Sequence, residues 1–163
     1  GSIRMQKRVY TLLYNIVSGV MTAAVAVSCA TDTVYYSYAH TPVAGWEKND
    51  TLTFNIPGMA APGTYSQQVG LRMTSAFPFT SISLIVEQRI MPRGKVLTDT
   101  IKCPITDIRG NFLGDGISSF QYMFPLREVT LNKKDSIHVS IRHNMKREIL
   151  PGVSDIGLKM EFK

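Results

Sequence analysis

The residue with the clearest chemistry is Cys29, which follows the small residues Ala26 and Ser28 at the end of an apolar run. Small side chains at these positions let a signal peptidase reach the backbone, and the tail Ala26-Val27-Ser28-Cys29 resembles a lipobox. In a lipobox, the cysteine thiol receives a diacylglycerol before the preceding segment is cleaved. The pattern therefore predicts that Cys29 is lipidated and becomes the first residue of the mature chain.

The segment before Cys29 is organised like a bacterial export signal. Arg4, Lys7 and Arg8 precede a stretch without formal charge from residue 9 to residue 27. An uncleaved transmembrane anchor and an ordinary signal peptide are the alternatives, because about 20 mainly apolar residues suffice to cross a bilayer. Polar residues within the run, and the small residues before Cys29, favour cleavage.

These features divide the chain into three parts. Residues 1–28 are predicted as a helical signal peptide of the lipoprotein type, in which residues 1–4 are a cloning scar or an upstream start. Residues 29–33 are predicted as the lipidated cysteine and a short tether, and residues 34–163 as the folded domain. The 135 residues from Cys29 onward are enough for one domain with its own core.

The charge of the chain argues against a nucleic-acid partner. The formal net charge is +6, but residues 1–28 hold three cations and no acids, so the remainder carries only +3. A mild surplus spread over mixed signs differs from the concentrated basic surface of a nucleic-acid-binding protein. We therefore expect no nucleic-acid partner.

After Cys29, the hydrophobic pattern has the period of two that is typical of half-buried strands. No window of ten or more residues keeps the spacing of an amphipathic helix. The expected strands, separated by turn residues, are 34–40, 51–56, 65–73, 81–90, 95–101, 117–124, 136–145 and 156–163. They predict an all-β fold, a single antiparallel β-sandwich of about seven or eight strands, whose order stays open. Cys103, among apolar neighbours, is expected to be a small buried side chain.

The histidines and hydroxyl-bearing residues form no recognisable catalytic or metal-binding set. His138 and His143 lie five positions apart on one expected strand, so their side chains should point to opposite faces. His40 is distant, and no acidic or cysteine cluster completes a ligand set. The chain has no Gly-x-Ser-x-Gly elbow and no phosphate-binding loop of the Walker type. We therefore predict no metal, no cofactor and no enzymatic activity.

The glycine-rich loop at residues 107–116 allows two interpretations. An aspartate in such a loop most often caps a turn through hydrogen bonds to the nearby backbone, and Asp107 and Asp115 fit that role. Calcium binding is the alternative, although the regular oxygen-ligand spacing of a calcium motif is missing. We expect the loop to wrap around Phe112 and Leu113.

The aromatic cluster Tyr35, Tyr36, Tyr38 and Trp46 is the best candidate for a binding surface. Exposed flat rings on a β-sandwich can stack on sugars, and they can also anchor protein interfaces. Tyr35, Tyr38 and Trp46 are the predicted interaction residues. The alternative is that the alternation turns some of these rings into the core.

Several longer motifs accompany the lipobox: YYSYAHTPVAGWEKNDTLTFNIP, the hairpin IVEQRIMPRGKVLTDTI, the loop RGNFLGDGI, the strand end SIRHNM and the terminal SDIGLKMEF. On these motifs the chain resembles the gliding-motility lipoprotein GldH family of the phylum Bacteroidota. The resemblance spans residues 29–163, and none of its motifs is a catalytic signature.

The resemblance implies a lipid-anchored protein of the cell envelope that is associated with the machinery for surface gliding, with other envelope proteins as partners. It also implies that Cys29 matches the lipidated cysteine. The further family-motif positions are Trp46, Asp50, Asp99, Gly110, Phe112, Leu113, Gly114, His143, Asp155 and Gly157, with Phe112 where a tryptophan would be expected.

Two expectations about placement and function follow. The resemblance implies a phylum in which acidic residues just after the lipidated cysteine often signal display on the cell surface. Here Asp32 is the single acid among residues 30–33, so we expect an outer-membrane position facing the periplasm. The first functional hypothesis is a non-enzymatic envelope lipoprotein that contacts other envelope components. The second is a carbohydrate- or peptidoglycan-binding module that uses Tyr35, Tyr38 and Trp46.

Overall fold

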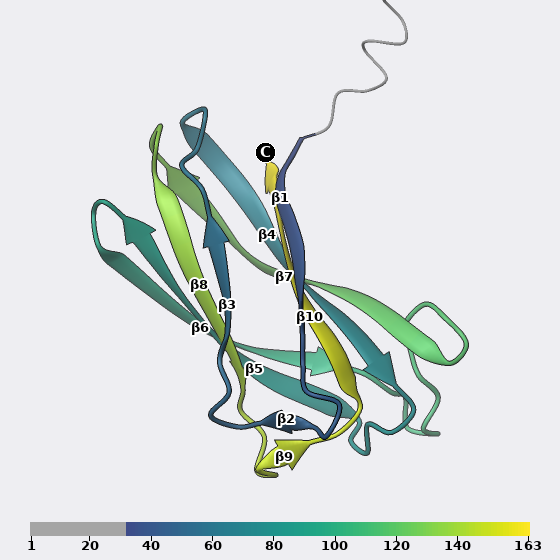
Figure 1. Ribbon diagram of the computed structural model, residues 1–163. Coiled ribbons are helices and arrows are strands. Elements are labelled where there is room, and N and C mark those ends of the chain that lie inside the picture. The colour runs from purple at the N-terminus through teal and green to yellow at the C-terminus, as the bar shows by residue number, and fades with distance from the viewer. Residues whose placement is uncertain (1–31) are drawn as a thin grey trace, which may run out of the picture. The chain divides into compact units, whose positions relative to one another are not determined.

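The computed structural model describes residues 32–163, which fold entirely into antiparallel strands and the loops between them (Figure 1). The predicted signal peptide, the lipidation site Cys29 and most of the predicted tether lie outside these described residues. The strands are β1 (Thr33–His40), β2 (Trp46–Glu47), β3 (Leu52–Ile56), β4 (Gly63–Thr74), β5 (Ser81–Met91), β6 (Lys95–Pro104), β7 (Ser119–Leu131), β8 (Ser136–His143), β9 (Ile149–Leu150) and β10 (Val153–Phe162).

Eight of the strands form two four-stranded sheets that pack face to face. The first sheet has the order β1-β10-β4-β7, the second has the order β3-β8-β5-β6, and β2 pairs with β9 in a short ribbon. This order is that of a jelly roll, in which eight antiparallel strands fold into two sheets. The predicted all-β sandwich is confirmed.

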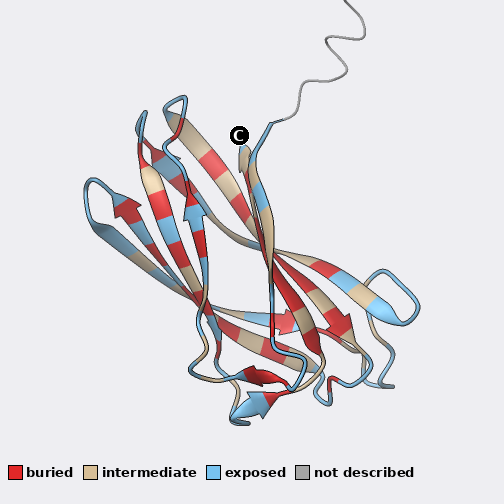
Figure 2. Cartoon of the chain, in the orientation of Figure 1, coloured by how far each residue is buried: buried red, intermediate tan, exposed pale blue. Residues whose placement is uncertain are grey.

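The alternating pattern of the sequence accounts for the core. In β4, for example, Val69, Leu71 and Met73 are fully buried, while Gly70 and Arg72 between them lie on the outer face of the sheet, where Tyr38 covers Gly70. Figure 2 shows the same alternation as bands along both sheets. Cys103 is 1% exposed, as expected of a small buried side chain. His138 is exposed and His143 is buried, as their odd spacing predicted.

One end of the sandwich, here called the entry end, is where β1 begins. Thr33 pairs with Glu161 near the end of β10, and Tyr65 at the start of β4 pairs with Phe162. The turns at residues 57–62, 92–94 and 132–135 lie at the same end (Figure 1).

Hydrogen bonds join these turns to one another. The Met59 N–H donates to the Asp135 carbonyl at 2.9 Å, and the Lys134 N–H donates to the Met59 carbonyl at 2.8 Å. Arg93 donates to the Asp135 carboxylate at 2.8 Å, and this hydrogen bond joins the turn at 92–94 to the turn at 132–135. The entry end is therefore one connected surface.

The opposite end, here called the pocket end, carries the loops at residues 41–45, 75–80, 105–118 and 144–148, together with the β2-β9 ribbon. Phe112 stacks on Phe120 with ring centroids 4.4 Å apart, so this part of the expected loop packing is confirmed. Leu113 is 56% exposed, so the prediction that the loop wraps around it is wrong. Its backbone N–H is bound to the Ile105 carbonyl, and this hydrogen bond leaves the side chain outside.

Within residues 32–163, no helix is long and apolar enough to cross a membrane.

Candidate functional site

The outer surface of the first sheet carries two tyrosines from its edge strand. Tyr36 and Tyr38 lie on the same side of β1, with ring centroids 5.6 Å apart and hydroxyl oxygens 3.3 Å apart. Tyr36 is 45% exposed. Tyr35 is on the other side of the strand, where it packs against the core. The alternation of β1 therefore separates Tyr35 from Tyr38, and Tyr36 takes the place that was predicted for Tyr35.

Two glycines create the space in which Tyr38 lies across the sheet. A Cβ on Gly157 of β10 would be 2.7 Å from the Tyr38 ring, and a Cβ on Gly70 of β4 would be 2.6 Å from its hydroxyl. The two glycines are register partners in neighbouring strands. The family-motif position Gly157 thus has a physical role, which is to let the tyrosine ring lie against the backbone.

The far end of Tyr38 is held by β7. Gln121 donates a hydrogen bond from Nε2 to the Tyr38 hydroxyl at 3.3 Å, and Met123 Sδ accepts from this hydroxyl at 3.9 Å. Tyr36 also donates to Met123 Sδ, at 3.8 Å. The two rings are therefore fixed by contacts with three other strands, so the surface is preorganised.

Two cations lie against the tyrosine rings. The Arg72 guanidinium carbon is 3.8 Å from the centre of the Tyr38 ring, and Lys159 Nζ is 5.4 Å from the centre of the Tyr36 ring. Both are within the range of cation-π attraction. Burial, and then the hydrogen bond with Tyr36, raise the pKa of Tyr38 to about 12, so the phenol stays protonated at neutral pH. We call Tyr36, Tyr38, Arg72, Gln121, Met123 and Lys159 the tyrosine face.

Asp155 connects the tyrosine face to a pocket. Its side chain is 10% exposed, its Oδ2 lies 4.0 Å from Arg72 Nη1, and its Oδ1 contacts Nδ1 of His40. His40 follows Tyr36 and Tyr38 on the same side of β1, and its side chain is 86% exposed. The row Tyr36, Tyr38 and His40 therefore leads along β1 directly to the pocket end.

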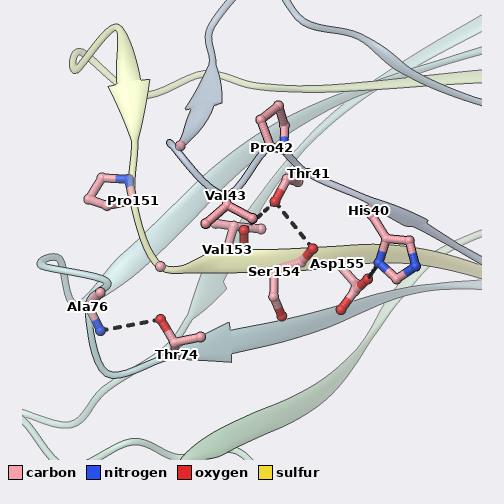
Figure 3. A pocket seen from close by; sticks show the side chains of 12 residues that line it. His40, Thr41, Pro42, Val43, Thr74, Ala76, Pro151, Val153, Ser154 and Asp155 are labelled. Carbon is pink, nitrogen blue, oxygen red and sulfur yellow. Dashed lines mark hydrogen bonds and ion pairs between the residues drawn. The ribbon is translucent and has the colours of Figure 1, made fainter.

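The end pocket has a volume of about 570 Å³ and opens between the end of β1, the start of β10 and the loop after β4 (Figure 3). Thr41 donates from Oγ1 to the main-chain carbonyls of Val153 and Ser154. Gly152 has φ of +84°, and a Cβ there would be 2.2 Å from the Phe77 nitrogen, so this wall requires glycine. The pocket is lined by His40, Thr41, Pro42, Val43, Gly45, Thr74, Ala76, Pro151, Gly152, Val153, Ser154 and Asp155.

The hydroxyl groups of the pocket are committed to the backbone. Besides Thr41, Ser154 donates from Oγ to the Arg72 carbonyl at 2.9 Å, and Thr74 Oγ1 accepts from the Ala76 N–H at 3.4 Å. A nucleophile needs a base within hydrogen-bond reach, and these hydroxyls are directed to main-chain groups instead. A recess with a mainly apolar lining and a few polar groups is suited to binding.

Trp46 is fully buried, so the prediction that it contributes to an interaction surface is wrong. Its indole N–H donates to the Asp50 carbonyl at 2.7 Å, and its carbonyl lies 3.0 Å from His143 Nε2. The Trp46 and His143 rings meet edge to face at 5.2 Å. Three family-motif positions thus form one cluster that attaches the β2 segment to the end of β8: Trp46 and His143 are buried, and the half-buried Asp50 contributes its main-chain carbonyl.

The remaining predicted positions lie apart from the tyrosine face. Asp99 Oδ2 of β6 lies 3.4 Å from Arg127 Nη1 of β7, so this ion pair links the edge strands of the two sheets. Gly110 has φ of +84° in the loop after β6, and a Cβ on Gly114 would be 2.6 Å from the Tyr122 ring.

Asp107 acts as the cap of its own turn. Its Oδ1 accepts from the N–H groups of Arg109 at 2.9 Å and Asn111 at 2.8 Å. These hydrogen bonds, that of Asn111 first, hold the pKa of Asp107 below its ordinary value. Within residues 32–163, no group of three or more His, Cys, Asp and Glu side chains is arranged to hold a metal ion. The turn-capping interpretation therefore explains this carboxylate without a cation.

Sequence reasoning missed four members of the tyrosine face, namely Arg72, Gln121, Met123 and Lys159. They come from β4, β7 and β10, which are far apart in the chain and become neighbours only through the strand order. In the sequence, these residues could be recognised only as the outward-facing positions of alternating strands. Without the order of the strands, that pattern does not show that they are neighbours.

Comparison with known proteins gives consistent matches over nearly the whole described domain. The model of the family described as GldH lipoprotein matches residues 33–160. The gliding motility lipoprotein GldH of Flavobacterium johnsoniae is 26% identical over 150 residues, covering 88% of this chain and 93% of its own. A gliding motility lipoprotein GldH homolog of Christiangramia forsetii is 24% identical over 143 residues, covering 82% and 86%.

Solved structures give only distant likenesses. The globular domain of zebrafish complement 1qA has a TM-score of 0.44 at 9% identity, covering 82% of this chain and 97% of that one. A family 35 carbohydrate binding module from Clostridium thermocellum has a TM-score of 0.39 at 8% identity, covering 79% and 95%. Neither likeness bears on function, because both TM-scores are below 0.5.

Proposed function

The chain belongs to the GldH lipoprotein family, and on that premise we propose that it is a non-enzymatic component of an envelope assembly that is anchored by lipid on Cys29. Its curated relatives are named gliding motility lipoproteins, so it is a lipoprotein of the cell envelope tied to gliding motility. The anchor would hold it at the outer membrane, facing the periplasm. Its task would be to bind another envelope protein.

The observation that carries the proposal is the tyrosine face. Tyrosine and arginine are enriched among the residues that dominate binding energy at protein interfaces. Here Tyr36, Tyr38 and Arg72 lie together on an outer sheet surface, and contacts across four strands hold them before any partner arrives. Preorganised side chains lose little conformational entropy on binding, which favours affinity.

The end pocket adds a recess beside this flat surface. His40, which continues the row that starts at Tyr36 and Tyr38, and its partner Asp155 both belong to the pocket lining. A partner that lay along β1 could therefore place a side chain in the pocket while covering the tyrosine rings. A flat aromatic surface next to a recess is suited to a polypeptide partner.

Glycan stacking is less well supported than protein contact. Trp46 is buried and Tyr35 faces the core, so two of the three rings predicted for sugar binding are not available on this surface. One face of the Tyr38 ring is already covered by the Arg72 guanidinium. Only Tyr36 retains substantial exposure.

Site-specific photo-cross-linking in the native host tests the proposal. A photoreactive phenylalanine analogue in place of Tyr36 should give a discrete adduct with one envelope protein. The same analogue in place of Glu87, which is exposed on the second sheet, is the matched control and should not give that adduct. The same set of adducts from both positions would contradict the proposal. An adduct whose apparent mass falls on muramidase digestion would indicate peptidoglycan instead of a protein.

A further inference from the structure

The entry end carries a surplus of positive charge that ion pairing leaves unmatched. Within residues 32–163, Lys95, Lys133 and Lys134 are exposed and have no acidic partner within salt-bridge distance. Lys95 follows the turn at 92–94, and the two other lysines lie in the turn at 132–135. The Arg93 to Asp135 hydrogen bond joins these two turns.

The carboxylates at the same end are already neutralised by neighbouring cations. Asp135 pairs with Arg93 at 2.8 Å, and Glu161 pairs with Lys159 at 2.8 Å. Glu128 contacts Lys163. Asp32, the residue before β1, offsets one of the three lysines, so the entry end keeps a surplus of two positive charges.

The pocket end has no such surplus. Its loops contain five acidic and four basic residues, which are Glu47, Asp50, Asp107, Asp115, Glu148, Lys48, Arg109, Lys146 and Arg147. Among the loops and turns, the surplus of positive charge therefore lies at the entry end.

Exposed apolar residues lie at the same end as the three lysines. Ala60, Ala61 and Pro62 are exposed in the turn at 57–62, and Met91 is 44% exposed beside the turn at 92–94. The Met59 hydrogen bonds hold the first of these turns against Lys134 and Asp135. Binding to the headgroup region of a membrane strengthens with buried apolar area and with attraction to anionic lipids, and this end offers both apolar and positively charged groups.

The tether brings this end to the membrane. Thr33 is only four positions after Cys29, and a fully extended chain spans at most about 3.6 Å per residue. An acylated Cys29 therefore lies no more than about 14 Å from the start of β1, which is at the entry end. The positive surface is thus confined near the lipid surface.

We infer that the entry end docks on phosphate-bearing lipid headgroups of the membrane that holds the anchor, through Lys95, Lys133 and Lys134. This inference rests on the proposed lipid anchor at Cys29. The contact fixes the orientation of the domain, so that β1 runs away from the membrane and the end pocket is held at the membrane-distal end. The partner would then be met from the periplasmic side.

The test uses the acylated full protein, purified from host membranes and reconstituted into phosphatidylcholine vesicles with or without phosphatidylglycerol. A membrane-impermeant acetylating reagent reports the labelling rate of each lysine by mass spectrometry. Lys95, Lys133 and Lys134 should be labelled about fivefold more slowly on the anionic vesicles, the factor expected for the attraction of one lysine to such a surface. Lys102 and Lys146, exposed elsewhere, should be labelled at equal rates on both.

Charge reversal separates attraction from simple proximity. In Lys133→Glu/Lys134→Glu, Lys95 should lose its protection, whereas in the matched control Lys102→Glu/Lys146→Glu it should keep it. Protection should also disappear in high salt, since the screening length falls to about 3 Å at 1 M. Equal labelling rates on both kinds of vesicle would overturn the headgroup contact while leaving the anchor intact. An intact mass without lipid on Cys29 would overturn the anchor itself, and with it the inference.

Discussion

Gln67 and Gln88 form a reciprocal pair of hydrogen bonds across the interior of the sandwich. Gln67 Nε2 donates to Gln88 Oε1 at 2.6 Å, and Gln88 Nε2 donates to Gln67 Oε1 at 2.8 Å. The two side chains are 2% and 0% exposed. Because Gln67 lies in β4 and Gln88 in β5, the pair joins the two sheets through the core. Each amide satisfies a polar group that would otherwise be buried without a partner.

Removing one of these amides should destabilise the domain more than removing both. Gln67→Leu or Gln88→Leu leaves the other amide buried and unsatisfied, which costs about 1–3 kcal/mol of unfolding free energy. The double variant replaces both partners by apolar groups of similar size and should recover most of that loss. Urea unfolding of the four proteins measures the coupling. Additive losses would show that the pair does not act as a unit.

Trp46→Ala should unfold or strongly destabilise the domain, because it leaves a large cavity and removes the hydrogen bond to the Asp50 carbonyl. Truncating a buried tryptophan typically costs about 3–5 kcal/mol. Tyr36→Ala, at an exposed position with a few surface contacts, should cost clearly less, about 1 kcal/mol. Chemical denaturation followed by circular dichroism compares the two. A stably folded Trp46→Ala protein with an unchanged midpoint would contradict the buried position of the ring.

Gly157→Ala should disturb the tyrosine face, because the new methyl group would lie 2.7 Å from the Tyr38 ring. Overpacking of this kind costs about 1–3 kcal/mol. In the double variant Gly157→Ala/Tyr38→Ala the clash is absent, so the cost of adding the methyl group should be smaller than in the native background. Unfolding midpoints and the near-ultraviolet tyrosine signal report both effects. Equal cost in both backgrounds would mean that Gly157 has no role in seating Tyr38.

Stability should fall as the pH drops below about 6.5, because of His143. Burial lowers its pKa from the ordinary value of 6.5, and the nearby Lys48 also lowers it, while the Trp46 carbonyl and Glu148 act in the opposite direction. The Met145 N–H donates a hydrogen bond to His143 Nδ1 at 3.3 Å, and only the neutral ring can accept it. As the pH falls, His143 takes up a proton more readily in the unfolded chain than in the folded one, so acid favours unfolding. The stabilisation from the neutral His143 is fully present only above the pKa that this histidine has in the unfolded chain.

His143→Gln is the control for this pH dependence. A glutamine amide can still donate to the Trp46 carbonyl but does not titrate. Unfolding free energies measured from pH 8 to pH 5 should therefore fall less steeply for this variant than for the native protein. Equal slopes would assign the acid sensitivity to other groups.

The strands could be predicted from the sequence, because the period of two is a local property of each run. Phe54 and Ile56, for example, alternate with polar residues and are buried as expected. Gln88 stands in the same inward row as Val86 and Ile90, so the alternation places it toward the core. Its hydrogen-bonded partner could not be foreseen, since Gln67 is in another strand and only the fold brings the two amides together.

The candidate site was predictable only in part. Tyr38 stood out as an aromatic residue in a strand, but Arg72 and Gly157 reach it through the pairing of β1 with β10 and of β10 with β4. Trp46 lies in a strand of two residues, too short for alternation to tell a buried ring from an exposed one. Strand order and register, which are long-range properties, decide both points.

The lipid anchor is the central claim, and metabolic labelling with a palmitate analogue in the host, combined with membrane fractionation, tests it most directly. Cys29→Ser is the test variant and Cys103→Ser is the matched control, because Cys103 is the only other cysteine and is buried in the domain. We expect label and membrane retention in the native protein and in Cys103→Ser, and loss of both in Cys29→Ser. Label that persists in Cys29→Ser, or a native protein that carries none, would contradict the lipid anchor at Cys29.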